Sequence, residues 1–316
     1  MVCCNLDKNP KTGVRYHNLS QEQQMYMQRL QKDVVGDTLG GGGSSPGRGR
    51  GGTTRQQFDL ACTRALRRLQ FDPKGTLQPL LPYMVQWLAT SAHQNLRNLR
   101  LLASLIRASK AIICNSNLEL ELYLDQIMPI LLTCVVSKRL CEDEAVEDHW
   151  QLRRLAAQTV SDACEKFGAK YPKLQLRILK TYRKALTNPK TPWTTAYGAL
   201  AGLYHLGEFS VESVLLPIAE TFLARLGPVV ETGKEDGTEA GTDASRQIAQ
   251  SNAVQCNGAL LQAAGLLYGK GGSSETVKER LLTLFGDKLL PYCQQESNSV
   301  QGGRKAVHLN PVNMLF

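Results

Sequence analysis

Few residues in this sequence have the types and spacing that metal binding requires. Asp148 and His149 stand beside an acidic run and are the one pair with metal-ligand chemistry. A zinc site needs further His, Cys or carboxylate ligands at set spacings, and adjacent residues at a helix start project to different sides. We therefore predict that Asp148 caps a helix, that His149 and Trp150 pack or dock, and that the chain holds no metal.

Motifs for covalent catalysis and phosphate binding are also missing. No Gly-x-Ser-x-Gly nucleophile turn is present. The Gly-rich segments 36–52 and 269–274 match a phosphate loop only in composition, because neither joins a strand to a helix. The nine cysteines include no Cys-x-x-Cys and mostly lie in apolar runs, which predicts free thiols in a reducing compartment. A Cys–His pair from distant parts of the chain stays an open alternative. We expect a protein that is not an enzyme and binds no cofactor.

Positive charge is concentrated in the first part of the chain. Residues 1–190 hold 28 Lys and Arg against 16 Asp and Glu, whereas residues 191–316 hold 9 against 12. Four basic residues at helical spacing form a stripe, namely Arg97, Arg100, Arg107 and Lys110. Such a stripe is usually a solvated surface. It is also the footprint that contact with nucleic acid would need, so direct binding of DNA or RNA is the alternative function.

Large amphipathic side chains lie at or near the starts of predicted helices. Trp and Arg at the edges of turns are typical anchors of protein interfaces. The predicted partner-docking residues are His149, Trp150, Arg153, Lys190, Pro192, Trp193 and Tyr197. Most aromatic residues at helical spacing belong to a core, so the sequence leaves open whether Trp193 is an anchor or a core residue.

The elements that must position these residues are helices. Apolar residues recur at three and four throughout, and no strand-like alternation of useful length is present. The helices come in pairs with a period of about 40–47 residues, which is typical of HEAT and armadillo units. The expected pairs are 55–71 with 77–91, 95–115 with 118–138, 149–168 with 171–187, and 192–206 with 208–226, followed by an end cap beyond 244.

The predicted fold is all-α, a HEAT-repeat solenoid of about five helix pairs with a flexible Gly-rich linker and an acidic disordered loop. Ser20 with Gln23 forms a capping box, and Gly36 ends the helix that it starts. No signal core or membrane-length apolar run is found, so we expect an intracellular protein without membrane contact. The predicted segments are an irregular N-terminus (1–18), an isolated helix (19–35), a Gly-rich linker (36–54), a HEAT-repeat domain (55–227), an acidic loop (228–243), a C-terminal helical pair (244–293) and a tail (294–316).

Two runs of residues carry a family likeness. They are Asp148-His149-Trp150-x-Leu152-Arg153 and Lys190-Thr191-Pro192-Trp193-Thr194-Thr195-x-Tyr197-Gly198. With supporting matches at Leu19-Ser20-x-Glu22-Gln23-Gln24 and around Ile127–Cys141, the chain resembles the C-terminal HEAT domain of the TFIID subunit 6 family of TBP-associated factors over residues 19–35 and 55–227. The Pro-Trp-Thr-Thr run is the most specific part of the likeness. Arg154 departs from the pattern, since the family tends to have an acid there.

The resemblance implies a non-enzymatic scaffold of RNA polymerase II initiation in the nucleus. Family members dock other TBP-associated factors within TFIID during preinitiation complex assembly, and some also serve the SAGA coactivator. They usually carry an N-terminal histone fold that pairs with the subunit 9 factor. No histone fold precedes residue 19 in this sequence, so we do not expect that pairing or the promoter contacts that depend on it.

Overall fold

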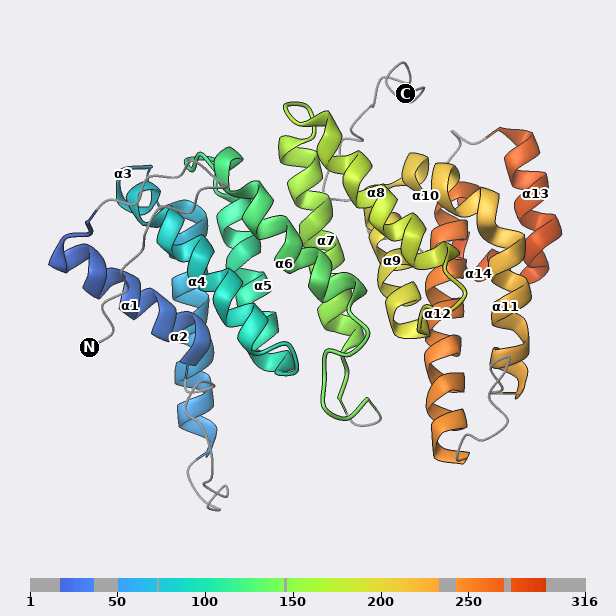
Figure 1. Ribbon diagram of the computed structural model, residues 1–316, viewed down its shortest axis with the longest axis horizontal. Coiled ribbons are helices and arrows are strands. Elements are labelled where there is room, and N and C mark those ends of the chain that lie inside the picture. Colours follow the sequence, from blue (N-terminus) through green and yellow to red (C-terminus); the bar gives the residue numbers. More distant parts are fainter. Residues whose placement is uncertain are drawn as a thin grey trace. The chain divides into compact units, whose positions relative to one another are not determined.

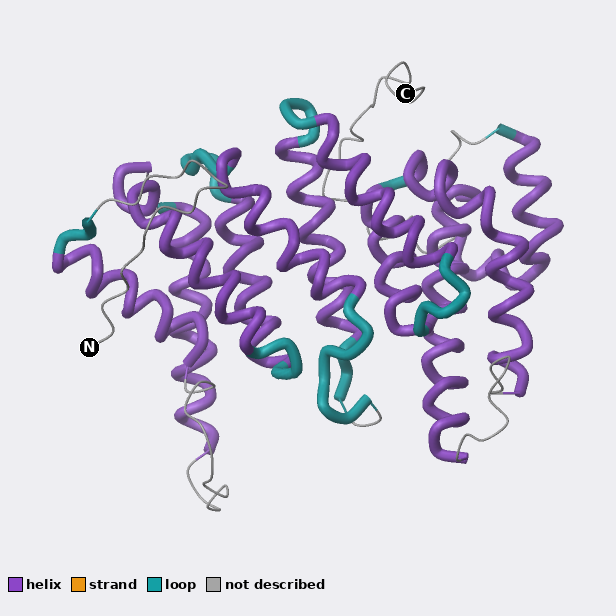
Figure 2. Tube along the Cα trace, in the orientation of Figure 1, coloured by secondary structure: helices purple, strands orange, loops and turns teal. Residues whose placement is uncertain are grey.

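The computed structural model describes residues 18–36, 51–72, 74–144, 147–232, 243–269 and 274–293, and every regular element among them is a helix. Figure 2 shows helices joined by loops, with no strand in this described part. The all-α prediction is confirmed. Contacts divide the chain into two compact units, one made of Met1–Cys134 with Leu140–Glu142 and the other of Val135–Arg139 with Asp143–Phe316. Each unit is described by itself.

The first unit is built from successive helices (Figure 1). They are α1 (Gln21–Val35), α2 (Gly51–Phe71), α3 (Lys74–Leu77), α4 (Leu81–Gln94), α5 (Leu99–Cys114) and most of α6 (Leu124–Val136), with 3₁₀ turns at Gln78–Leu80 and Glu121–Tyr123. The apolar positions at helical spacing, such as Leu102, Leu105 and Ile112 of α5, are buried between them.

Helix α1 begins with the predicted capping box. The backbone N–H of Gln23 donates to Ser20 Oγ at 3.2 Å, and the backbone N–H of Ser20 donates to Gln23 Oε1 at 3.0 Å. The helix ends at Gly36, whose φ of 60° lies in the left-handed region that favours glycine. Its buried face packs against α2 and α5. The helix expected to be isolated is therefore part of the core of the first unit.

Helix α5 starts slightly later than the sequence suggested. Asn98 is its N-cap, with the side-chain oxygen accepting from the Leu101 N–H at 3.1 Å. Arg97 therefore lies in the turn before the helix, not on the predicted helical stripe. After the helix, the side-chain amide of the buried Asn115 donates to the Leu69 carbonyl at 2.9 Å. This hydrogen bond fixes the end of α5 to α2.

The second unit contains the remaining helices. They are α7 (Trp150–Phe167), α8 (Pro172–Thr187), α9 (Trp193–Leu206), α10 (Glu208–Leu215), α11 (Ala219–Thr232), α12 (Asp243–Gly269), α13 (Glu275–Phe285) and α14 (Leu290–Cys293), with 3₁₀ turns at Leu216–Ile218 and Gly286–Leu289. The predicted helices 149–168, 171–187 and 192–206 agree with α7, α8 and α9 to within one or two residues at each end.

Helix α9 is the centre of the second unit. It packs against α7, α8, α10 and α12, and every residue from Trp193 to Leu203 is buried. Such all-round burial requires small residues where neighbours approach closely. A Cβ at Gly198 would collide with the Val135 carbonyl, and one at Gly202 would collide with the Tyr182 ring. The alternation of bulky and small residues in this helix is therefore a packing requirement.

Some predicted boundaries were wrong. Residues 51–54, expected in the Gly-rich linker, form the start of α2, and residues 228–232, expected in the acidic loop, continue α11. The rest of the linker and of the loop, with the N-terminus and tail, lies outside the described residues. Helix α12, expected as part of an end cap, runs beside α9 (Figure 1) and buries a row of small and apolar residues against it. It is a core helix of this unit.

One helical stretch in the described part, Glu208–Thr232, is long and apolar enough to cross a membrane by length and composition. It consists of α10, a 3₁₀ turn and α11, which pack against α8, α9 and α12. Because core helices of soluble proteins pass the same test, this is weak evidence for a membrane segment.

Candidate functional site

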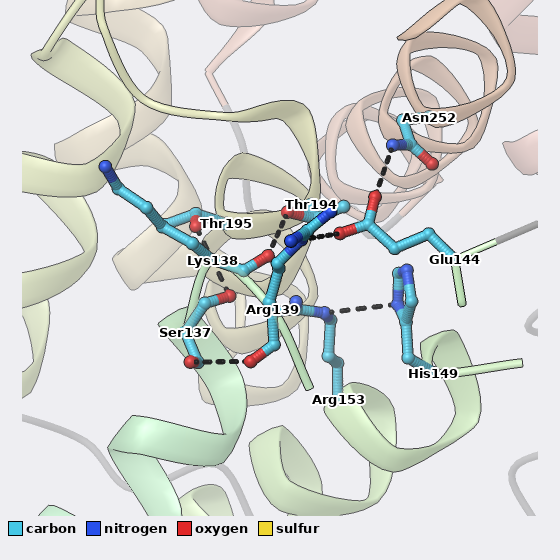
Figure 3. Close-up of polar contacts among 9 residues, drawn as sticks. All are labelled: Ser137, Lys138, Arg139, Glu144, His149, Arg153, Thr194, Thr195 and Asn252. Atoms are coloured by element: carbon cyan, nitrogen blue, oxygen red, sulfur yellow. Dashed lines mark hydrogen bonds and ion pairs between the residues drawn. The ribbon is translucent and has the colours of Figure 1, made fainter. Parts of the chain in front are cut away.

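The runs Asp148–Arg153 and Lys190–Gly198 both contact Val135–Arg139, which comprises the last two residues of α6 and the three residues after it. Arg153, fully buried on α7, donates from Nη1 to the Val135 carbonyl at 2.8 Å. Its Nε donates to His149 Nδ1 at 3.4 Å, one helical turn away (Figure 3). A buried guanidinium in this position anchors the last turn of α6 to the first turn of α7, because it supplies the donor that a helix C-terminal carbonyl lacks.

The first turn of α9 holds the same segment from the other side. Thr194 Oγ1 donates to the Lys138 carbonyl at 2.9 Å, and Thr195 Oγ1 donates to the Ser137 carbonyl at 3.4 Å (Figure 3). Both threonines are buried, so their hydroxyl groups need partners inside the protein. The paired threonines of the Pro-Trp-Thr-Thr run are thus explained by hydrogen bonds to the backbone.

The charge state of His149 follows from its position. Burial, and secondly the Arg153 guanidinium, lowers its pKa from 6.5 to about 4, so the imidazole is neutral at physiological pH. Nδ1 accepts the hydrogen bond from Arg153, which places the proton on Nε2. The neighbouring Asp148 accepts from the Trp150 N–H at 3.0 Å at the start of α7. Asp148 therefore caps the helix start, as predicted, although His149 occupies the N-cap position itself.

The aromatic residues of the two runs pack against protein. Trp150 is half-buried and lies edge-on to Tyr197, with ring centroids 4.6 Å apart. Trp193 is 5% exposed and meets the Phe222 ring of α11 edge-on, with centroids 6.0 Å apart. The structure therefore answers the question that the sequence left open. Trp193 is a core residue.

Arg225 on α11 belongs to this site, although the sequence did not single it out. Its guanidinium carbon lies 4.6 Å from the centroid of the Trp193 ring and 5.2 Å from that of Phe222. Its Nη1 donates to the Asn188 carbonyl at 2.8 Å, which ties α11 to the turn between α8 and α9. One signal was available, because an arginine between Phe222 and Leu226 interrupts an otherwise apolar helix face. Nothing in the sequence indicated that Trp193 was its partner.

A cavity of about 750 Å³ opens beside this turn. Its wall combines the α6–α7 connection, the turn before α9, and parts of α11 and α12. The lining residues are Lys138, Arg139, Glu144, Pro189, Lys190, Thr191, Pro192, Trp193, Thr194, Arg225, Pro228, Val229, Ser245, Ile248, Ala249 and Asn252. Arg139 Nε lies 3.8 Å from Glu144 Oε1, and the Asn252 amide donates to Glu144 Oε2 at 3.4 Å (Figure 3). The Lys190–Gly198 run therefore borders the cavity through its first residues, whereas no residue of the Asp148–Arg153 run lines it.

The predicted docking residues divide into two groups. His149, Arg153 and Tyr197 are buried and do not line the cavity, whereas Trp193 is buried but borders the cavity. That these four residues belong to a docking surface stays a prediction, and their burial favours a supporting position. Trp150 and Pro192 are half-buried, and Lys190 is exposed. Of these three, Pro192 and Lys190 line the cavity.

The basic stripe lies in the first unit. Arg97, Arg100 and Arg107 are exposed, whereas Lys110 is half-buried. Arg100 and Arg107 share one face of α5, two turns apart, while Arg97 precedes the helix. The helical part of the stripe therefore begins at Arg100 and not at Arg97. All three arginines are exposed to solvent.

The described residues include no group of three or more His, Cys, Asp or Glu side chains able to hold a metal ion. Cys134, Cys141, Cys164 and Cys256 are buried, and Cys114 is exposed. Burial raises the pKa of Cys164 to about 12, and it also raises the pKa of Cys256. A thiol with so high a pKa is a poor nucleophile.

Comparison with known proteins shows the family of the chain. Residues 15–220 match the model of the TAF6 C-terminal HEAT repeat domain family. The chain belongs to this family. The matched residues include the Asp148–Arg153 run, the Lys190–Gly198 run and the Val135–Arg139 segment that both runs contact. It stops before most of α11 and all of α12, so Arg225 lies outside it.

Several relatives have the family's name. The chain is 32% identical over 220 residues to "SAGA complex/transcription factor TFIID complex subunit Taf6" of Schizosaccharomyces pombe, covering 70% of this chain and 44% of that protein. It is 33% identical over 214 residues to "Transcription initiation factor TFIID subunit 6" of Drosophila melanogaster, covering 67% and 32%. The chain thus spans less than half the length of these relatives.

A solved structure supports the fold. The TAF6 C-terminal domain from Antonospora locustae aligns with a TM-score of 0.53 and 21% identity, covering 75% of this chain and 98% of that one. The HEAT-repeat prediction is confirmed by this likeness and by the family match.

Proposed function

We propose that this chain acts in the nucleus as a non-enzymatic scaffold subunit of the general transcription factor TFIID, and also of SAGA. Family membership supports this, together with the complexes named for relatives that match much of the chain. The site agrees with such a role, because its polar side chains are used to fix backbone segments and not to surround a reacting group.

Docking would occur on the face around the turn between α8 and α9. The observation that carries this proposal is the arrangement of the two sequence runs, whose buried members hold Val135–Arg139 while Lys190 and Pro192 reach the cavity. Interface anchors are most effective when their backbone is already fixed before binding, since less conformational entropy is lost. The partners would be other TBP-associated factors and, in the second complex, SAGA subunits.

Affinity purification of the tagged chain from nuclear extract, followed by mass spectrometry, tests this function. We expect TBP-associated factors to be enriched over an untagged control. Recovery of no TFIID or SAGA subunit would overturn the proposal. A second control is an unrelated helical-repeat protein of similar charge, which carries the same tag.

A second candidate function, a basic HEAT-repeat adaptor that binds nucleic acid directly, is supported by the exposure of Arg97, Arg100 and Arg107. If these arginines neutralise phosphates, log affinity should fall linearly with log salt, with a slope of about −0.9 for each contact on duplex DNA. Replacing Arg100 and Arg107 with Glu should make the slope less steep by about 1.8 or more, because two contacts are lost. Absence of DNA or RNA binding at low salt would end this alternative.

A further inference from the structure

The cavity beside the α8–α9 turn is mainly cationic. Lys138, Arg139, Lys190 and Arg225 line it, and Glu144 is the single carboxylate among its lining residues. Glu144 is already within ion-pair distance of Arg139. The ammonium groups of Lys138 and Lys190 have no ion-pair partner among the described residues, and both residues are exposed. Two of the four cations that line this cavity therefore carry a charge that no described acidic residue pairs with.

The start of α9 adds to this positive potential. Its first two residues, Trp193 and Thr194, line the cavity. No side chain caps this helix end, and no acidic residue lies in its first turn. Helix N-termini attract anions through their free N–H groups and the helix dipole. Combined with the unpaired lysines, this end favours a negatively charged ligand.

The remaining wall is apolar. Pro189, Pro192 and Trp193 form one side, and Val229, Ile248 and Ala249 from α11 and α12 form another. A bare inorganic anion would leave this surface uncovered, and apolar surface contributes to binding only when a ligand removes it from water. The volume of about 750 Å³ lies within the range of about 300–1,000 Å³ that is typical of ligand pockets. The wall thus suits a ligand with both carboxylates and aliphatic groups.

We propose that this cavity receives a short acidic segment of a partner protein, with Glu or Asp side chains paired to Lys138 and Lys190 and an aliphatic side chain against Pro192 and Ile248. This inference rests on the proposed scaffold function and names the chemistry of its partner. A peptide is favoured over nucleic acid because the apolar wall, which includes Pro192, Val229 and Ile248, can be covered by aliphatic side chains, and a nucleic acid has none.

The test uses the full chain and fluorescence anisotropy with labelled peptides. The probe is a peptide of alternating Glu and Leu with Gly-Ser spacers, and the matched peptide has Gln in place of Glu. We expect the Glu peptide to bind about tenfold more tightly, which corresponds to two exposed charge pairs of modest strength. Equal affinity for the two peptides would overturn the proposal, as would binding of a single-stranded oligonucleotide in preference to the Glu peptide.

Variants make the test specific to the cavity. The double variant Lys138→Glu/Lys190→Glu should lose at least about tenfold in affinity for the Glu peptide. Glu144→Gln should gain affinity by about threefold, because it removes the one opposing charge and keeps an oxygen for Asn252. The control Lys180→Glu, an exposed lysine of α8 away from the cavity, should change the affinity by less than about twofold. An unchanged affinity in both cavity variants would contradict the proposal.

Failure of this inference is distinguishable from failure of the scaffold function. If the tagged wild-type chain and its Lys138→Glu/Lys190→Glu variant recover TFIID subunits equally, the scaffold function stands and the cavity proposal is wrong. If the variant recovers fewer subunits than the wild-type chain while its melting temperature is unchanged, both are supported.

Discussion

Arg153 and Lys190 are both cations in the family's most recognisable runs, yet the structure uses them in opposite ways. Arg153 is fully buried and donates to the Val135 carbonyl, whereas Lys190 is exposed at the rim of the cavity. We call the buried residues His149, Arg153, Thr194, Thr195 and Gly198 the inner layer, and Lys138, Lys190 and Pro192 the outer layer. The same run of sequence therefore contains residues that build the site and residues that can contact a partner.

This difference shows how a recognisable motif can be misinterpreted. Trp193 looks like an interface anchor by residue type, but its ring is covered by Phe222 and by the Arg225 guanidinium. Inner-layer substitutions should therefore act through stability, and outer-layer substitutions should act through binding with little change in stability. The two behaviours can be separated by experiment, from the largest expected effect to the smallest.

Arg153→Ala should lower the free energy of unfolding by about 3–5 kcal/mol, because it leaves a buried carbonyl without its donor and creates a cavity. The neighbouring Arg154 is exposed, so Arg154→Ala should change stability by less than about 0.5 kcal/mol. Urea denaturation followed by circular dichroism measures both. Equal effects of the two variants would abolish the distinction between the layers.

The stability of the chain should fall as the pH is lowered from 6.5 to 4. The folded state lowers the pKa of His149 to about 4, so the unfolded chain binds more protons in this window. The stabilisation from neutral His149 is fully present above pH 6.5 and is lost as the pH falls through about 4, with a size of about 2–3 kcal/mol.

His149→Gln should remove this part of the pH dependence, because an amide oxygen can accept from Arg153 Nε without titrating. His93→Gln, at an exposed histidine of α4, is the matched control and should keep the dependence. Melting curves between pH 4 and 7 provide the comparison. If the melting temperature of His149→Gln still falls with pH as steeply as that of the original chain, a group other than His149 causes the pH dependence.

Gly198→Ala should destabilise the chain by about 1–3 kcal/mol, since its Cβ would meet the Val135 carbonyl in a backbone contact that cannot easily move. Gly258 lies inside α12, and a Cβ added there would meet open space, so Gly258→Ala should stabilise by about 0.5–1 kcal/mol through helix propensity. Opposite signs in chemical denaturation are the expected result. Destabilisation by both variants would contradict it.

Lys190→Ala should leave stability within about 0.5 kcal/mol of the original chain, because the side chain is exposed and has no ion-pair partner in the described part. Thermal denaturation measures this directly. A loss of several degrees in melting temperature would place Lys190 with the inner layer.

Much of the fold could be predicted from the sequence because helical periodicity and turn residues are local signals. The starts of α8 and α9 follow from Pro172 and Pro192, and Gly207, with a φ of 96°, ends α9 as its position suggested. The site was harder to predict. Burial of Trp193 depends on α11, and Thr194 and Thr195 donate to carbonyls 56 and 58 residues away in sequence. Periodicity does not show which helices meet. The pairing of α12 with α9 was missed for the same reason.

The central claim is that the outer layer docks partner subunits while the inner layer holds it in place. The most direct test is affinity purification of three tagged chains from nuclear extract: the original, Lys138→Glu/Lys190→Glu, and the control Lys180→Glu, each with its melting temperature measured. We predict that the original and the control recover TBP-associated factors equally, and that the double variant recovers fewer at an unchanged melting temperature. Equal recovery by all three chains would contradict the claim.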